Sequence, residues 1–212
     1  PAIPADVNTI FLVNWDRMDD LYGPLGTLPA DLAAFANSTV GGVPVNGVVI
    51  PIGSIPGVSA GFSAWDLNPC DPAAANVIVD NVVSYIQGVA DAHPTLRHVT
   101  VVGSDEVVPF ERLEYETIVA NESTYTEGFA DNALYGSQFT RHYLSDAPYG
   151  DLDPVAWLDR FAYLPDLGVG RLVETPDQIA AALTTFQTNG GLLDPQTAAT
   201  AGYDFLTDGA EQ

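Results

Sequence analysis

The most concentrated set of potential ligand side chains lies in the segment Ser145–Asp153, which reads SDAPYGDLD. It places Asp146, Asp151 and Asp153 within eight positions. Hard cations bind several oxygen atoms, commonly carboxylates together with backbone carbonyls. In an extended chain, Asp151 and Asp153 point to the same side, which favours a shared ion. We therefore predict a calcium site at these three aspartates, although the spacing is not that of an EF-hand and a solvated acidic turn is the alternative.

A second pair of charged residues, Asp166 and Arg171, lies in the otherwise apolar stretch Tyr163–Leu172. Leu167 to Leu172 reads as a buried strand, so Asp166 falls at its amino edge. A carboxylate there could accept backbone N–H bonds or orient an imidazole from elsewhere in the protein. Arg171 could pair with an acid, which would offset the cost of burying its charge. The spacing alone favours structural roles for both.

Residues for nucleophilic catalysis are few. The one cysteine, Cys70, lies in a turn-like segment, and the three histidines are His93, His98 and His142. None of the histidines stands in a nucleophile pattern with a cysteine or serine, so we predict structural or surface roles for all four residues. No Cys/His spacing indicates a zinc site. A nucleotide site is not expected, because no glycine-rich phosphate loop is present.

Composition limits the partners of the chain. The 212 residues carry a formal net charge of −22 and contain no lysine. Such a surface repels nucleic acid and anionic membranes, and no apolar run reaches the roughly 18 residues of a membrane span. The acidity suits a cation-rich setting, either calcium outside the cell or high salt. Because the sequence starts at Pro1 without methionine, we expect a processed or excised piece of a longer protein.

The elements that must position these residues alternate between strands and helices. Apolar strands are expected at 8–14, 46–53, 97–103 and 167–172, with helices at 27–38, 71–92 and 175–188 between or after them. This alternation predicts an α/β fold, a three-layer sandwich with a mostly parallel sheet and helices on both faces. We treat residues 1–212 as one domain, with a long irregular insertion at 104–162 that carries a short helix at 133–141. A last strand at 199–209 leaves the fold incomplete, so the chain reads as the first part of a larger unit.

In an open parallel sheet, ligands bind beyond the carboxyl ends of the strands. The segments that leave those ends here are NWDRMDD, GSDEVVPF and LVETPDQ. The third is mainly a helix cap. Asp105, in the second, is expected to accept N–H bonds of the turn in which it lies.

Three ordered stretches, VTVVGSDEVVPF, LSDAPYGDLD and YLPDLGVGRLVETPDQI, resemble the gingipain-type cysteine peptidases of the caspase-like clan. The resemblance covers about residues 97–190. It implies a caspase-like sheet and an endopeptidase with a Cys–His dyad. Two positions depart from the pattern: Ser104 stands where the family more often passes from glycine directly to aspartate, and Asp166 replaces a glutamate.

The same resemblance implies roles for individual residues. Asp166 matches the acid that assists the family's histidine, and Ser145 and Asp146 match a Ser-Asp pair whose neighbourhood contributes to cation binding. The dyad itself lies downstream of the strand that contains Arg171 in that family. This chain has no His-Gly motif, and Cys70 comes nearly a hundred residues too early, so the dyad is not within these residues.

The sequence thus leads to a functional hypothesis and an alternative. The first is the amino-terminal part of a secreted gingipain-like cysteine endopeptidase, located outside the cell or at its surface. Its partners would be the remainder of its own chain and, in the complete enzyme, a polypeptide substrate. The alternative is a non-catalytic extracellular module, stabilised by calcium, that serves as a scaffold or binding domain. A flavodoxin-like ligand binder is a weaker option, because it would need an anion-binding loop that the sequence lacks.

Overall fold

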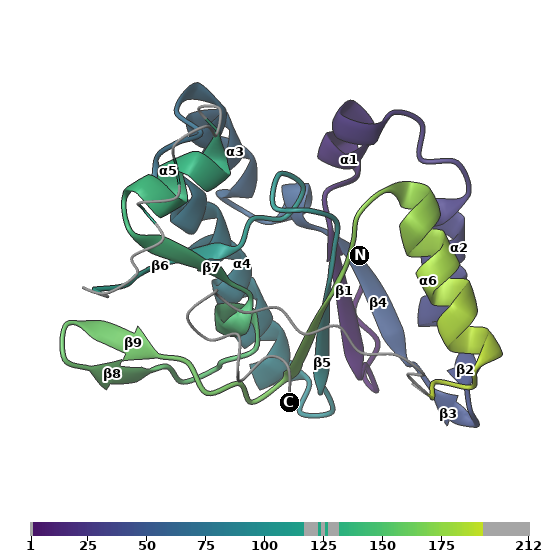
Figure 1. Cartoon of the computed structure of the whole chain (residues 1–212). Coiled ribbons are helices and arrows are strands. Elements are labelled where there is room, and N and C mark those ends of the chain that lie inside the picture. Colours follow the sequence, from purple (N-terminus) through teal and green to yellow (C-terminus); the bar gives the residue numbers. More distant parts are fainter. Residues whose placement is uncertain (1, 117–122, 124–125, 127–131, 193–212) are drawn as a thin grey trace, which may run out of the picture.

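The computed structural model describes residues 2–116, 123, 126 and 132–192. Its centre is a four-stranded parallel sheet in the order β10-β5-β1-β4 (Figure 1). The strands are β1 (Thr9–Val13), β4 (Gly47–Pro51), β5 (His98–Val102) and β10 (Gly168–Leu172). All five residues of β1 are buried, as expected for a strand with neighbours on both sides and helices on both faces.

Helices cover both faces of this sheet. On one side lie α2 (Leu28–Ala36) and α6 (Pro176–Thr188), which contact each other; on the other lie α3 (Val58–Leu67) and α4 (Pro72–Ala92), which also form a pair (Figure 1). A shorter helix, α1 (Trp15–Tyr22), follows β1 at its carboxyl end. The described residues therefore confirm the predicted α/β class, a three-layer arrangement with a parallel sheet in the middle.

The helix boundaries follow from local signals. Asp71 caps α4 by accepting the backbone N–H of Ala73, and Pro72 occupies the first helical position. The capping box predicted at the start of α6 is present, since Thr175 and Gln178 each bond the other's backbone N–H. Helix α4 packs one apolar stripe on the core; its buried residues are Ala75, Ile78, Val79, Val82, Ile86 and Val89.

The insertion at 104–162 contains several small elements in addition to the expected short helix, which is α5 (Ala133–Phe139). The strands β6 (Glu111–Glu114) and β7 (His142–Ser145) pair antiparallel, as do β8 (Val155–Trp157) and β9 (Arg160–Ala162). A 3-10 turn, η3 (Ala147–Tyr149), follows β7. Elsewhere, β2 (Thr39–Val40) and β3 (Val43–Pro44) form a third antiparallel pair, and η1 (Ile52–Ser54) follows β4. The strand expected at 199–209 lies outside the described residues.

The connections between strands diverge at the centre of the sheet. The chain leaves β1 towards β4 on one side, whereas it leaves β5 towards β10 on the other. Because β1 and β5 are neighbours, their carboxyl ends form the topological switch point at which open α/β sheets bind ligands. The segments that leave there are the ones that carry Arg17 and Glu106.

Candidate functional site

Three carboxylates converge at the amino end of β10. Asp151, Asp153 and Asp166 each place one oxygen within 4.8 Å of the others. Asp151 is buried, with 1% of its surface exposed, while Asp153 and Asp166 face solvent. Three carboxylates at this separation could hold a metal ion, and their oxygen-only chemistry fits a hard divalent cation.

Backbone hydrogen bonds fix the acidic group by tying two chain segments together. The carboxylate of Asp151 accepts the N–H of Asp153 at 3.0 Å and that of Leu164, and the carboxylate of Asp166 accepts the N–H of Leu152 at 2.9 Å. In the reverse direction, the N–H of Asp166 donates to the carbonyl of Gly150 at 2.8 Å. Residues 150–153 therefore lie beside residues 164–167, and the β8–β9 hairpin projects between them.

Asp146, the third aspartate expected to bind the ion, lies apart from this group. Its two carboxylate oxygens accept hydrogen bonds from Arg171, at 2.9 Å from Nε and 2.6 Å from Nη2. The structure thus brings together two of the three residues that the sequence indicated for metal binding. It adds Asp166, for which the sequence suggested a catalytic supporting role.

Arg171 is the centre of a buried junction at the carboxyl half of β10. Besides Asp146, its guanidinium donates to the backbone carbonyls of Gly103 and Val108 at 2.9 and 2.8 Å and lies 3.8 Å from the ring centre of Phe110. Its side chain is only 8% exposed. A buried arginine is tolerated when its charge and its N–H groups all have partners. The partners of Arg171 therefore explain how a charged side chain can lie on an otherwise apolar strand.

A second buried arginine, Arg112, binds the loop that follows β5. Arg112 forms a bidentate pair with Asp105, at 2.6 and 2.8 Å, and its backbone exchanges two hydrogen bonds with the side chain of Asn76 on α4. Asp105 also accepts the N–H of Phe110, so the prediction that it satisfies the turn is confirmed. The sequence analysis gave Arg112 no role, although the scarcity of basic residues was a usable signal. Arg112 is one of only six arginines, and it follows the apolar run Val107–Phe110 by two positions.

Glu111, next to Arg112 on β6, is buried without a complete set of partners. It is 8% exposed, and its Oε2 atom has no hydrogen-bond partner among the described residues. Burial, with a smaller contribution from the negative charge of Asp80, raises the pKa of Glu111 to about 8, while Arg112 acts in the opposite direction. The carboxyl of Glu111 is therefore largely protonated at neutral pH. Burial, with smaller contributions from the charges of Glu111 and Asp80, raises the pKa of Tyr163 to about 12.

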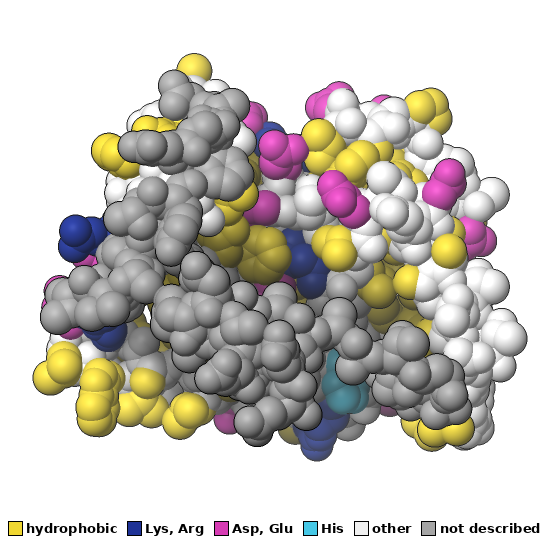
Figure 2. Space-filling view, viewed as in Figure 1, with side chains coloured by type: hydrophobic (Ala, Val, Ile, Leu, Met, Phe, Trp, Pro, Cys, Tyr) yellow, Lys and Arg dark blue, Asp and Glu magenta, His cyan; other side chains and the backbone are white. Residues whose placement is uncertain are grey.

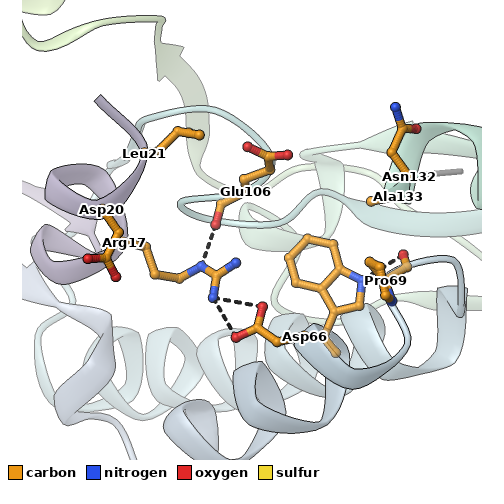
Figure 3. A pocket seen from close by; sticks show the side chains of 9 residues that line it. Arg17, Asp20, Leu21, Asp66, Pro69, Glu106, Asn132 and Ala133 are labelled. Carbon is orange, nitrogen blue, oxygen red and sulfur yellow. Dashed lines mark hydrogen bonds and ion pairs between the residues drawn. The ribbon is translucent and has the colours of Figure 1, made fainter. Parts of the chain in front are cut away.

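A pocket of about 410 Å³ opens at the switch point of the sheet (Figure 3). Arg17 crosses its floor, donating to the carbonyl of Glu106 at 2.6 Å and to both carboxylate oxygens of Asp66 at 3.0 Å. The lining residues are Arg17, Asp20, Leu21, Trp65, Asp66, Pro69, Glu106, Asn132 and Ala133. The sequence indicated the two segments that leave β1 and β5, but it could not show that α3 and the start of α5 close the other side.

The histidines and the cysteine do not form a catalytic arrangement within the described residues. The thiol of Cys70 donates to the carbonyl of Asn132 at 3.4 Å, and a ring nitrogen of His142 lies 3.0 Å from the hydroxyl of Thr140. His93 caps the end of α4, and His98 begins β5. In the described part of the chain, no helix is both long and apolar enough to cross a membrane.

Comparison of the chain with protein-family models, with curated proteins and with solved structures found no match.

Proposed function

We propose that this chain is the amino-terminal, structural part of a secreted gingipain-like cysteine endopeptidase, whose Cys–His dyad comes from sequence beyond these residues. In the complete enzyme, the cysteine thiolate would attack the peptide carbonyl, and the histidine would carry the proton to the leaving amine. The part described here would supply the sheet that supports those groups. By itself it would not cleave peptides.

The observation that carries this proposal is the junction at Arg171. The three stretches that resemble the family are separated in sequence, yet Arg171 from the third bonds Asp146 from the second and the carbonyls of Gly103 and Val108 from the first. Only the Arg171–Asp146 contact joins two side chains, whereas the contacts to Gly103 and Val108 are made by backbone carbonyls. The meeting of the three stretches at one buried ion pair supports the proposal that they belong to one structural core.

The acidic group contributes a second part of the proposal, a structural calcium ion. Calcium accepts carboxylate and carbonyl oxygens in flexible geometry, which suits three aspartates on two neighbouring loop segments. An ion bound by Asp151, Asp153 and Asp166 would join the segments on either side of the β8–β9 hairpin. Calcium is also the hard divalent cation expected for a strongly acidic protein outside the cell.

For Asp166, the geometry favours the ion over the histidine. Asp166 lies before the first residue of β10, and a five-residue strand is about 16 Å long. Groups that catalyse reactions on an open parallel sheet gather at the opposite, carboxyl edge. A supporting-acid role for Asp166 would require the histidine to reach the amino edge.

Peptide hydrolysis by the complete protein tests the proposal. The proposal expects cleavage of a fluorogenic peptide mixture that iodoacetamide abolishes, with full activity retained by the Cys70→Ser variant. Asp166→Ala then separates the two roles of that residue: unchanged turnover at saturating calcium removes the supporting-acid role. Absence of any thiol-dependent cleavage would refute the peptidase proposal.

The alternative of a non-catalytic, calcium-stabilised extracellular scaffold is favoured by one observation. The group of Asp151, Asp153 and Asp166 could hold an ion that joins two loop segments, and this role needs neither a cysteine nor a histidine. This alternative expects a complete protein that melts at a higher temperature with calcium yet shows no hydrolysis in the same assay.

A further inference from the structure

The β8–β9 hairpin projects from the protein at the amino edge of the sheet, whereas catalytic groups on such sheets gather at the carboxyl edge (Figure 1). Large apolar side chains of this hairpin lie in solvent: Val155, Trp157, Leu158 and Phe161 are 50, 63, 90 and 57% exposed. The space-filling view shows hydrophobic surface gathered at the place of the hairpin (Figure 2). A contiguous exposed apolar surface of this kind marks an interaction site.

The exposed side chains point to both faces of the hairpin. Trp157 pairs with Arg160, and Ala156 pairs with Phe161. Because successive side chains of a strand alternate between faces, Trp157 and Phe161 lie on opposite faces. A protein groove that covered one face would leave the other face in water. A surrounding that is apolar on both sides, such as the boundary of a lipid bilayer, covers both.

The turn of the hairpin holds a leucine in a conformation that disfavours it. Leu158 and Asp159 connect the paired strands, and Leu158 has a φ of +57°, in the left-handed region that glycine and asparagine adopt more readily. Since the side chain of Leu158 lies in solvent, packing within the folded chain does not offset this cost. A strained residue at an exposed turn indicates a function outside the fold itself.

The charges of the hairpin favour an uncharged surface as its partner. Residues 154–164 contain one acid and one base, Asp159 and Arg160, which bond each other at 3.2 Å, whereas the whole chain carries −22. A second copy of the chain, or an anionic lipid, would bring like charges together. Leu158 lies four residues beyond Pro154, about 13 Å along an extended strand, which exceeds the screening length of about 8 Å in physiological salt. The hairpin can therefore reach a neutral surface while the acidic body stays screened.

We propose that the hairpin inserts its tip, residues 157–161, into the interface of a zwitterionic lipid bilayer. The side chains of Trp157, Leu158 and Phe161 enter the boundary between headgroups and acyl chains, where aromatic rings are favoured. The guanidinium of Arg160 stays at the level of the phosphate groups while its alkyl stem covers apolar surface. Binding is peripheral and reversible, and it is independent of the proposed peptidase function.

Flotation of the complete protein with phosphatidylcholine vesicles at about 0.15 M salt tests this proposal. Leu158→Asn is expected to lower the partition coefficient about tenfold, because it removes one leucine from the apolar interface. Asparagine suits the left-handed turn, so this variant keeps the folded hairpin. Leu67→Asn is the matched control, because Leu67 is 89% exposed but lies on α3. Its partition coefficient should stay within about twofold of the parent.

A second measurement locates the contact with the lipid. Vesicles that carry bromine on their acyl chains quench tryptophans that enter the bilayer, and Trp157 is exposed on the hairpin. Trp157→Phe keeps an aromatic ring, so it should still float with the vesicles but lose the bromine-dependent quenching of the parent.

Four results would each overturn the proposal. They are no flotation of the parent at about 10 mM lipid, equal losses in Leu158→Asn and Leu67→Asn, quenching that persists unchanged in Trp157→Phe, and stronger binding to vesicles that contain anionic lipid. Sedimentation of the parent and Leu158→Asn without lipid tests the remaining occupant. A concentration-dependent dimer that Leu158→Asn abolishes would assign the hairpin to a second copy and would also overturn the proposal.

Discussion

Replacing Glu111 by glutamine should change how the stability of this protein depends on pH. Glutamine has the same shape as the protonated glutamic acid but stays neutral at every pH. In the folded protein, burial raises the pKa of Glu111 to about 8, against 4.5 for an ordinary glutamate. The folded state therefore holds this proton more tightly than the unfolded state does.

The direction and size of the effect follow from those two values. Below pH 4.5 Glu111 is protonated in both the folded and the unfolded state, so it does not change the free energy of unfolding. Between pH 4.5 and 8 the unfolded chain loses this proton first, so the free energy of unfolding falls as the pH rises. Above pH 8 the loss is complete. At about 1.4 kcal/mol for each pH unit between the two pKa values, the total approaches about 5 kcal/mol as an upper limit.

Denaturant unfolding of the parent chain and the Glu111→Gln variant at several pH values from 5 to 9 measures this contribution. The difference in unfolding free energy between variant and parent should grow in favour of the variant by about 3 to 5 kcal/mol across that range. Glu114→Gln, on the exposed end of the same strand, is the control and should follow the parent. If the Glu111→Gln and parent curves run parallel, Glu111 is ionised in the folded protein and the reasoning fails.

Three further outcomes are expected. Arg171→Met leaves the charge of Asp146 buried without a partner and should lower the unfolding free energy by about 3 to 5 kcal/mol. Arg160→Met, at an exposed pair, should lower it far less, and equal losses in the two variants would contradict the stabilising role of the Arg171 junction. Millimolar calcium should raise the melting temperature of the parent but not of Asp166→Asn, and a shift of equal size in both would place the ion elsewhere. Tyr149→Phe removes the buried hydrogen bond from the hydroxyl to the carbonyl of Pro109 and should cost about 1 to 3 kcal/mol in urea unfolding, so an unchanged midpoint would contradict that bond.

The parts of the fold that were predictable from sequence are those set by local chemistry. The apolar run of β1 and the 3.6-residue stripe of α4 each report burial directly, and the capping box at Thr175 fixes the start of α6. Helix α3 was missed because its sequence is locally a poor helix former. Gly61 lies in its interior, where a side chain would clash with Ile78 of α4, so packing between helices overrides propensity there.

The candidate metal group shows the limit of reading along the chain. Asp146 and Asp151 are five positions apart, yet Asp146 pairs with Arg171, which lies 25 positions downstream. Asp166 joins Asp151 because the β8–β9 hairpin returns the chain to its starting point. The approach of Asp166 to Asp151 depends on the pairing of β8 with β9. The spacing of the aspartates in the sequence does not show which strands pair.

Locating a reactive cysteine in the complete protein tests the proposed function most directly. The protein is treated with a peptide-like, thiol-directed inhibitor, and the labelled residue is identified by mass spectrometry. One cysteine downstream of residue 212 is expected to carry the label, with Cys70 unlabelled because its thiol donates to the backbone carbonyl of Asn132. Label on Cys70, or no label on any cysteine, would contradict it.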